Sequence, residues 1–272
     1  MKTKQTKLVS GLATNLSPDT SEDLEVSEII ESFKKEFLII KNMGFVKSHR
    51  ENNTGIGKTF EDLIGIKENN RKLADYKDVL ELKCTRKHSQ SRLTLFTEKP
   101  TYPKNVNTYL KDTFGQPDPK YPHLKVIHTT VSSKYNTFKD ELGFKLEVDY
   151  KEKKLFIRAI DLCTKESLDM EIYYTFEVLE KLVETKCKYI ACVTAEVNEI
   201  DGTEYFHYIH ATILTGLTFE KFLLFIDNGW VEYDIRIGSY KSGKKIGKPH
   251  DHGSGMRVKK NYIDKVFHKV EL

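Results

Sequence analysis

Apolar residues recur every three or four positions in three stretches of the chain, and this spacing predicts three amphipathic helices. The first is expected over residues 27–43 and should end at Gly44. The second is expected over residues 168–186, and the third over residues 218–228 with Thr218 as its N-cap. Each helix has one apolar face and should bury that face in the protein core.

Short runs rich in β-branched and aromatic residues predict strands in the rest of the chain. The dipeptide Asp201-Gly202 separates two such runs and predicts a tight hairpin turn, because both residues tolerate positive φ. Residues 101–122 are rich in proline and are predicted to form a loop. The expected strands cover residues 79–84, 125–132, 144–150, 154–161, 189–197 and 204–214. Together these elements predict an α/β (mixed α+β) fold.

The composition predicts a soluble, cytoplasmic protein. The formal net charge is +4, from 44 basic and 40 acidic residues, and this small excess does not by itself indicate nucleic-acid binding. No run approaches the roughly 18 apolar residues of a membrane span, and the N-terminus has no secretory signal. The four cysteines lack CxxC spacing, which argues against a zinc site. Residues 1–24 are rich in Lys, Thr and Ser without periodicity and are predicted to form a mobile tail.

The segment Glu81-Leu82-Lys83 carries the first candidate chemistry. In a strand, Glu81 and Lys83 would point to the same face, and Asp75, across a short turn, could place a second carboxylate beside Glu81. Two adjacent carboxylates repel each other unless a cation lies between them, and their oxygens favour Mg²⁺, for which Mn²⁺ can substitute. The lysine could then orient or deprotonate an attacking water, or stabilise charge on a phosphate.

Two alternatives accompany this interpretation. Asp78 offers a carboxylate that competes with Asp75 for the place beside Glu81. Charged residues also make up 31% of the chain, so a D…ExK pattern arises by chance, and the segment could be a solvated charged strand.

Basic and hydroxyl side chains cluster around this acidic segment. From Lys83 to Lys104 the chain has six Lys or Arg residues and one acid. Positive charge mixed with hydroxyl groups suits a track along DNA phosphates, and an exposed charged hairpin or solvated loop is the alternative. The candidate phosphate contacts are Ser48, Arg50, Arg86, Ser91 and Arg92.

The densest basic region lies near the C-terminus. Between Arg236 and Lys260 the chain has eight Lys or Arg residues, among them the candidate DNA contact Lys248, against one acid. Within this region His250-Asp251-His252 is flanked by glycines, which allow the backbone to approach another molecule closely. Three interpretations stay open: a second metal site, a flexible basic loop, or a loop that reads base edges. Arg, Lys and His suit guanine, and Asp suits the cytosine amine.

Several of these motifs resemble one known family. The run from Glu61 to Gly65, followed by Glu68-Asn69-Asn70, Asp75 and Glu81-Leu82-Lys83, resembles the MvaI/BcnI restriction endonucleases, in the MutH-like branch of the PD-(D/E)xK nucleases. The SRLTLFT run at 91–97 and the YDIRIG…GKPHDHGSGMR arrangement at 233–257 resemble the same family. One departure is Ala74, which stands where the motif has proline.

The resemblance implies roles for particular residues and an architecture. Asp75, Glu81 and Glu61 would bind the metal, and Lys83 would complete the catalytic site. Arg236, His250, Asp251, His252 and Arg257 would read the DNA bases. The fold would be restriction-endonuclease-like, with two MutH-like lobes around a DNA cleft. The catalytic lobe would cover residues 25–165 and the recognition lobe residues 166–272, with room for the two to interleave.

The implied function is that of a type II restriction endonuclease, which hydrolyses double-stranded DNA at a short, CC-N-GG-like site with Mg²⁺. The resemblance favours a monomer on DNA. It also implies a cognate DNA methyltransferase in the same system that is not a stable subunit. Two alternatives are a MutH-like nickase of DNA mismatch repair and a non-catalytic DNA-binding module whose acidic cluster is structural.

Overall fold

The computed structural model describes residues 21–67, 73–168 and 171–272. Most of the predicted tail (residues 1–20) and the Glu68-Asn69-Asn70 motif lie outside the described residues. Residues 21–24 were also predicted to belong to the tail, but they form the first turn of α1 (Ser21–Asn42), so this part of the prediction is wrong. The polar and acidic residues there suit a helix N-terminus but carry no apolar period.

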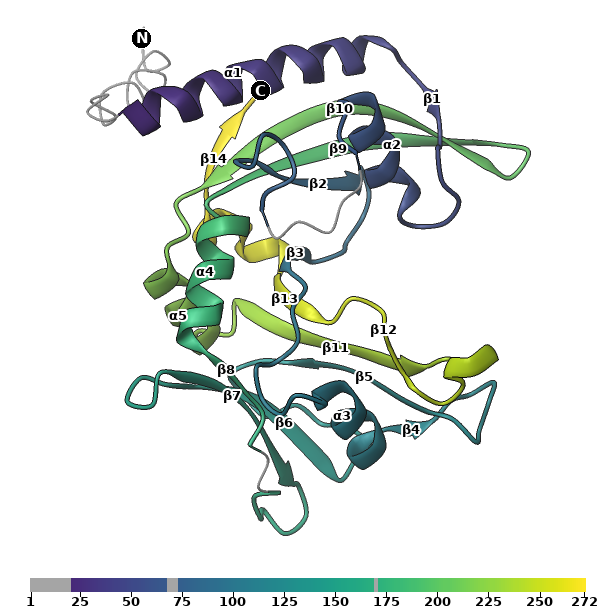
Figure 1. Cartoon of the computed structure of the whole chain (residues 1–272), viewed down its shortest axis with the longest axis vertical. Helices are drawn as coiled ribbons and strands as arrows, with labels where there is room; N and C mark the ends of the chain where they lie inside the picture. The colour runs from purple at the N-terminus through teal and green to yellow at the C-terminus, as the bar shows by residue number, and fades with distance from the viewer. Residues whose placement is uncertain (1–20, 68–72, 169–170) are drawn as a thin grey trace, which may run out of the picture.

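The first sheet is built on a long hairpin, whose turn has φ of 51° at Asp201 and 73° at Gly202. This confirms the predicted hairpin. Helix α1 packs on β10 and α2 (Gly55–Leu63) packs on β2, an edge strand that runs parallel to β9 (Figure 1). In order across the sheet, the strands are β1 (Val46–Lys47), β10 (Thr203–Thr215), β9 (Tyr189–Ile200) and β2 (Glu81–Arg86), and β14 (His268–Glu271) also pairs with β10.

The helical period of α1 places its apolar stripe in the core of this sheet. Phe33 and Phe37 are fully buried, and the Phe33 ring lies edge-on to Phe60 of α2 and to Tyr76. Burying a side chain of this size stabilises the fold by roughly 1.5–3 kcal/mol. Tyr76 belongs to the turn that precedes β2, so this core also supports the strand that carries Glu81 and Lys83.

The second sheet has one apolar and one polar face. Tyr233 and Ile235 of β11 lie in the core, while the intervening Asp234 and Arg236 belong to the other face. In order, its strands are β3 (Leu93–Phe96), β13 (Gly255–Val258), β11 (Val231–Ser239), β5 (Lys125–Val131) and β4 (Gln116–Pro117), and β12 (Pro249–Asp251) also pairs with β11.

The third sheet corrects the predicted helix over 168–186. Residues 173–175 form β8, and the helix begins at Phe176. Because Tyr173 and Tyr174 pair with β7, tertiary pairing overrides the helical spacing there. The sheet comprises β6 (Leu142–Asp149), β7 (Lys154–Asp161) and β8 (Tyr173–Thr175).

The proline-rich segment 101–122 is not a continuous loop, because it contains helix α3 (Val106–Phe114). Its prolines lie outside the helix and do not interrupt it. Helix α5 begins after Thr218, whose hydroxyl accepts a hydrogen bond from the Lys221 amide, as predicted. The remaining helices are α4 (Phe176–Lys186), α5 (Phe219–Asp227), α6 (Ile263–Val266) and the 3₁₀ turns η1 (Gly243–Lys245) and η2 (Lys260–Tyr262). No helix in the described part of the chain is long and apolar enough to cross a membrane.

The chain passes between the first and second sheets several times. Strand β2 belongs to the first sheet and β3 to the second, then β9 and β10 return to the first. Strands β11 to β13 build the second sheet, and β14 ends in the first. Strands from both sides of residue 165 therefore form both sheets, and the two sheets are interleaved along the sequence (Figure 1).

Candidate active site and nucleic-acid interface

The edge strand β2 presents Glu81 and Lys83 on one face. Lys83 Nζ lies 2.6 Å from Glu81 Oε1, while the side chain of Glu81 is only 7% exposed. Burial opposes the charge on Lys83, but the Glu81 carboxylate outweighs it and raises the pKa of the lysine. The two side chains therefore lie on one face of the strand, as expected, and also form an ion pair.

Asp75 lies in the turn before β2 and brings a second carboxylate to this place. Its Oδ2 accepts a hydrogen bond of 3.0 Å from the Leu82 amide. Burial, and then the neighbouring charge of Glu81, raises the pKa of Asp75. Asp78 is exposed, with φ of 59°, at the tip of the same turn. Asp75, rather than Asp78, is thus the carboxylate beside Glu81.

A second lysine, not predicted from the sequence, completes the surroundings of Glu81. Lys186, at the end of α4, places its Nζ 2.9 Å from Glu81 Oε2. The same ammonium group donates to the Leu73 carbonyl, just before Asp75. Lys186 lies 105 positions from Glu81, so no local spacing in the sequence could have indicated this contact.

Glu61 belongs to α2, the helix that packs on β2, and is half-buried. Burial, and then the charge of Glu61, raises the pKa of the Cys84 thiol on β2. Among residues 21–67, 73–168 and 171–272, no three or more His, Cys, Asp or Glu side chains are grouped so as to hold a metal ion. The structure therefore brings Asp75, Glu81 and Lys83 together, and the role of Glu61 as a third metal ligand stays a prediction.

The donor set that is present fits a magnesium ion. Mg²⁺ in phosphate chemistry is commonly held by one or two carboxylates and completes its shell with water and substrate oxygens. Asp75 and Glu81 supply two such carboxylates, and the raised pKa of Asp75 reflects in part a repulsion that a cation would offset.

On the polar face of the second sheet, a buried ion pair joins Arg257 of β13 to Asp234 of β11. Arg257 Nε donates to Asp234 Oδ2 over 2.8 Å, and both side chains are 6% exposed. The other guanidinium nitrogens of Arg257 donate to Thr94 Oγ1 and to the Gly253 carbonyl. Arg257 was expected to read bases. In this structure its side chain instead supports the polar face from within and does not lie on the surface.

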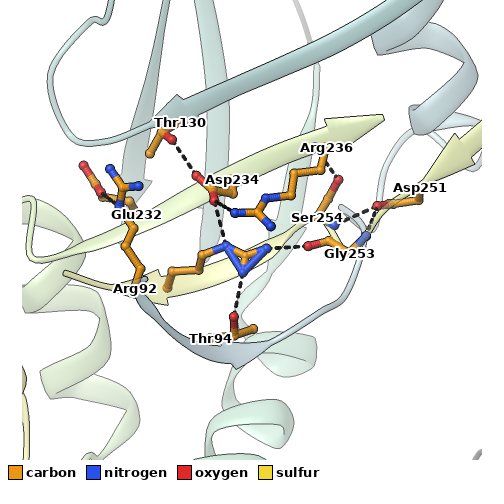
Figure 2. Close-up of polar contacts among 10 residues, drawn as sticks. Arg92, Thr94, Thr130, Glu232, Asp234, Arg236, Asp251, Gly253 and Ser254 are labelled. Atoms are coloured by element: carbon orange, nitrogen blue, oxygen red, sulfur yellow. Dashed lines mark hydrogen bonds and ion pairs between the residues drawn. The ribbon is translucent and has the colours of Figure 1, made fainter. Parts of the chain in front are cut away.

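Arg236 and Arg92 each pair with a carboxylate of β11 on this face (Figure 2). Arg236 is 49% exposed and donates from Nη2 to Asp234 Oδ2 over 2.9 Å. Arg92 is 40% exposed and donates from Nε to the buried Glu232. Each buried carboxylate thus holds an arginine in place while leaving some of its N–H groups free to face another molecule.

In the His250-Asp251-His252 segment, the aspartate supports the backbone while the histidine rings lie close to each other. Asp251 accepts hydrogen bonds from the Gly253 and Ser254 amides, so its carboxylate shapes the turn. His252 lies on the turn, with its ring centre 4.3 Å from that of His250. Partial burial, and then the charges of His250 and His128, lowers the pKa of His252. The described residues contain no metal-binding cluster, so the interpretation as a second metal site finds no support there.

A cavity of about 480 Å³ opens over the polar face. Its lining combines cationic, hydroxyl, imidazole and carboxylate groups, so it offers both hydrogen-bond donors and acceptors. His128 of β5 was not predicted from the sequence, and pairing of β5 with β11 places it opposite Arg236. The lining residues are Arg92, His128, Thr129, Thr130, Asp234, Ile235, Arg236 and His252.

The other predicted DNA contacts lie in several places. Arg86 makes a two-oxygen ion pair with Glu204 of β10. Ser48 donates to the Arg50 carbonyl in the segment that leads to α2. Ser91 and Lys248 are exposed, the first between β2 and β3 and the second between β11 and β12. These residues are not gathered into the cavity, and their contact with DNA stays a prediction.

An edge strand with Glu81-x-Lys83, a second carboxylate beside it and a mixed α/β scaffold define a nuclease fold of the PD-(D/E)xK type. The sequence model of the MvaI/BcnI restriction endonuclease family matches residues 34–267. The structure is similar to that of a restriction endonuclease MvaI–cognate DNA substrate complex, with a TM-score of 0.81 and 32% identity. That match covers 90% of this chain and 98% of the other. This chain belongs to the MvaI/BcnI restriction endonuclease family.

A second solved structure is similar over the same length. It is that of restriction endonuclease MvaI in the absence of DNA, with a TM-score of 0.57 and 31% identity over 90% of this chain and 97% of that one. No curated protein matches the chain in sequence. The comparisons therefore support the predicted family and fold class.

Proposed function

We propose that this chain is a type II restriction endonuclease that binds double-stranded DNA and hydrolyses its phosphodiester bonds with Mg²⁺. The observation that carries the proposal is the placement of Asp75 and Lys83 against Glu81 on the edge strand β2. Membership of a restriction endonuclease family gives the class of enzyme, namely site-specific cleavage of DNA. The geometry adds which side chains would carry out the reaction.

Asp75 and Glu81 would hold the magnesium ion, and Glu61 of α2 stays a predicted third ligand. A bound Mg²⁺ supplies Lewis acidity to a phosphate oxygen. The Lys83 ammonium lies on the same face as Glu81, where it would orient the attacking water. It would also stabilise the extra negative charge of the pentacovalent phosphate. Lys186 would keep Glu81 in the orientation that this arrangement needs.

The polar face of the second sheet would read the target sequence. Arg236 and His252 both line the cavity, and their N–H groups suit guanine O6 and N7. Asp234, itself held by Arg257, pairs with Arg236 and would fix the position of its guanidinium group. A G/C-rich site such as CC-N-GG fits these groups, and that particular site rests on the family resemblance.

The two comparisons support closure of the protein around DNA. The chain is more similar to the MvaI–DNA complex, at a TM-score of 0.81, than to MvaI without DNA, at 0.57. We take the described structure as the closed form, with an open form in the absence of DNA. One molecule would act on one site, and a separate DNA methyltransferase would protect the host sites without being a subunit.

Digestion of a plasmid of known sequence by the purified protein with Mg²⁺, followed by sequencing of the ends, tests the proposal. Discrete double-strand breaks at one recurring short sequence are expected. Nicked circles without linear product would instead indicate a MutH-like nickase. Salt-sensitive DNA binding without any cleavage in Mg²⁺ or Mn²⁺ would indicate a non-catalytic DNA-binding module.

A further inference from the structure

A second cavity, of about 530 Å³, lies next to the base-reading cavity. Arg92 lines both, so the two cavities lie on either side of this one side chain. The chemistry of the second cavity differs, because its side chains supply N–H donors and include no carboxylate. Its lining residues are Gln90, Arg92, Lys259, Lys260 and Asn261.

A buried carboxylate fixes two of these cations in place. Glu232 Oε2 accepts from Arg92 Nε, and Oε1 accepts from Lys259 Nζ, both at 2.9 Å. Glu232 is 7% exposed, so its two oxygens are largely used by these two partners. Arg92, Lys259 and Lys260 together with Glu232 carry a net charge of about +2. The Arg92 and Lys259 side chains are 40% and 35% exposed, so parts of both remain accessible.

The cavity also lies at the junction of the two sheets. Lys260 Nζ donates to the Ser89 carbonyl over 2.6 Å. Ser89 belongs to the short connection between β2, which carries Glu81 and Lys83, and β3 of the recognition sheet. A ligand held here would therefore be positioned against both the catalytic strand and the polar face.

We propose that this cavity binds one phosphate of the DNA backbone and so sets the register between the recognised bases and the cleaved bond. The proposal rests on the proposed nuclease function. Phosphate oxygens only accept hydrogen bonds, which matches a lining of cations and amide groups, whereas base edges present both donors and acceptors. Arg92 is shared with the base-reading cavity, and this favours a phosphate of bound DNA over a free phosphate ion.

The test measures DNA binding in Ca²⁺ over a range of salt concentrations. Replacing Lys260 with Gln removes one cation, and the slope of log Kd against log salt should fall by about 0.9, equally for specific and non-specific DNA. Lys260→Arg keeps the charge and should keep the slope. Gln90→Leu is an independent variant that should weaken binding without changing the slope. Lys151→Gln, in the exposed turn between β6 and β7, is the matched control and should behave as the unaltered protein.

A second measurement identifies the phosphate. Duplexes with one neutral methylphosphonate at successive positions should reveal one position that weakens binding of the unaltered protein but not of Lys260→Gln. An unchanged salt slope together with the same methylphosphonate penalty in both proteins would overturn the phosphate site and leave the nuclease intact. Absence of DNA binding by the unaltered protein would overturn the proposed function itself, and inhibition of that protein by millimolar inorganic phosphate alone would indicate a free anion site.

Discussion

Lys186 and Glu81 form an ion pair of 2.9 Å between the last turn of α4 and the edge strand β2. Lys83 holds the other carboxylate oxygen of Glu81 at 2.6 Å. Two ammonium groups thus bracket one buried carboxylate, and only Lys83 belongs to the recognisable motif. The orientation of Glu81 therefore depends on a helix that the motif does not include.

Replacing Lys186 with Met should reduce the cleavage rate at saturating DNA by roughly 10- to 100-fold, because a catalytic carboxylate that loses its orientation loses productive geometry. Binding of specific DNA in Ca²⁺ should change little. Lys186→Arg should recover most of the rate, which a general loss of stability would not allow. Lys181→Met, an exposed lysine on the same helix, serves as the control. Equal rates for Lys186→Met and the unaltered protein would exclude a positioning role.

Replacing Lys83 with Ala should reduce cleavage by at least about 100-fold, because the charge that develops on the phosphate loses the stabilising ammonium group. Specific binding in Ca²⁺ should stay nearly intact, which gel-shift titration can measure. Lys154→Ala is a matched control, because Lys154 also pairs with a glutamate two positions earlier, Glu152, but in the third sheet. Loss of binding with an intact rate at saturating protein would contradict the role of Lys83.

Replacing Arg257 with Met should lower the free energy of unfolding by about 3 kcal/mol, because Asp234 would lose one partner of a buried ion pair. Urea denaturation measures this change. The double variant Asp234→Leu with Arg257→Met should be less destabilised than the sum of the single variants, since the two residues are in contact. Additive effects would show that the pair is not coupled.

Replacing Arg236 with Ala should leave the unfolding free energy nearly unchanged, since half of its side chain is exposed. It should weaken specific binding by about 1–3 kcal/mol and relax the preference at one base pair. Selection from a randomised DNA library would identify that position. The contrast with Arg257 separates a base contact from a supporting one, and equal losses of affinity for every sequence would indicate a phosphate contact instead.

Spin labels at Glu199→Cys and Lys244→Cys, with Cys163→Ser to remove the exposed native thiol, should report closure on DNA. Residue 199 lies near the tip of the β9–β10 hairpin of the first sheet. Residue 244 lies in η1, between β11 and β12 of the second sheet. Cognate DNA should shorten and narrow the distance between them. The same distance distribution with and without DNA would contradict an open form.

The sequence predicts those features that depend on neighbouring residues. The apolar period of α1 and the Asp201-Gly202 turn are local, and Asp75, Glu81 and Lys83 lie within nine positions of each other. Features that depend on distant pairing were not predicted. Lys186 reaches Glu81 only after α4 has packed, and His128 reaches the cavity only through the register of β5 with β11.

Burial was also beyond a sequence-based prediction. The family resemblance implied a DNA contact for Arg257, but its three guanidinium nitrogens are used inside the protein. The same charge on Arg236 faces outward. The alternation of β11 places Glu232 and Asp234 under the arginines, and only the assembled sheet shows that these carboxylates are buried.

The repeated passage of the chain between the two main sheets limits how this enzyme could acquire a new target. No single cut in the sequence separates the strands of one sheet from those of the other, because β3 and β11 to β13 are divided by β9 and β10. The recognition surface cannot therefore be exchanged as a cassette between relatives. New specificity would have to arise by individual substitutions on a scaffold shared with the catalytic machinery.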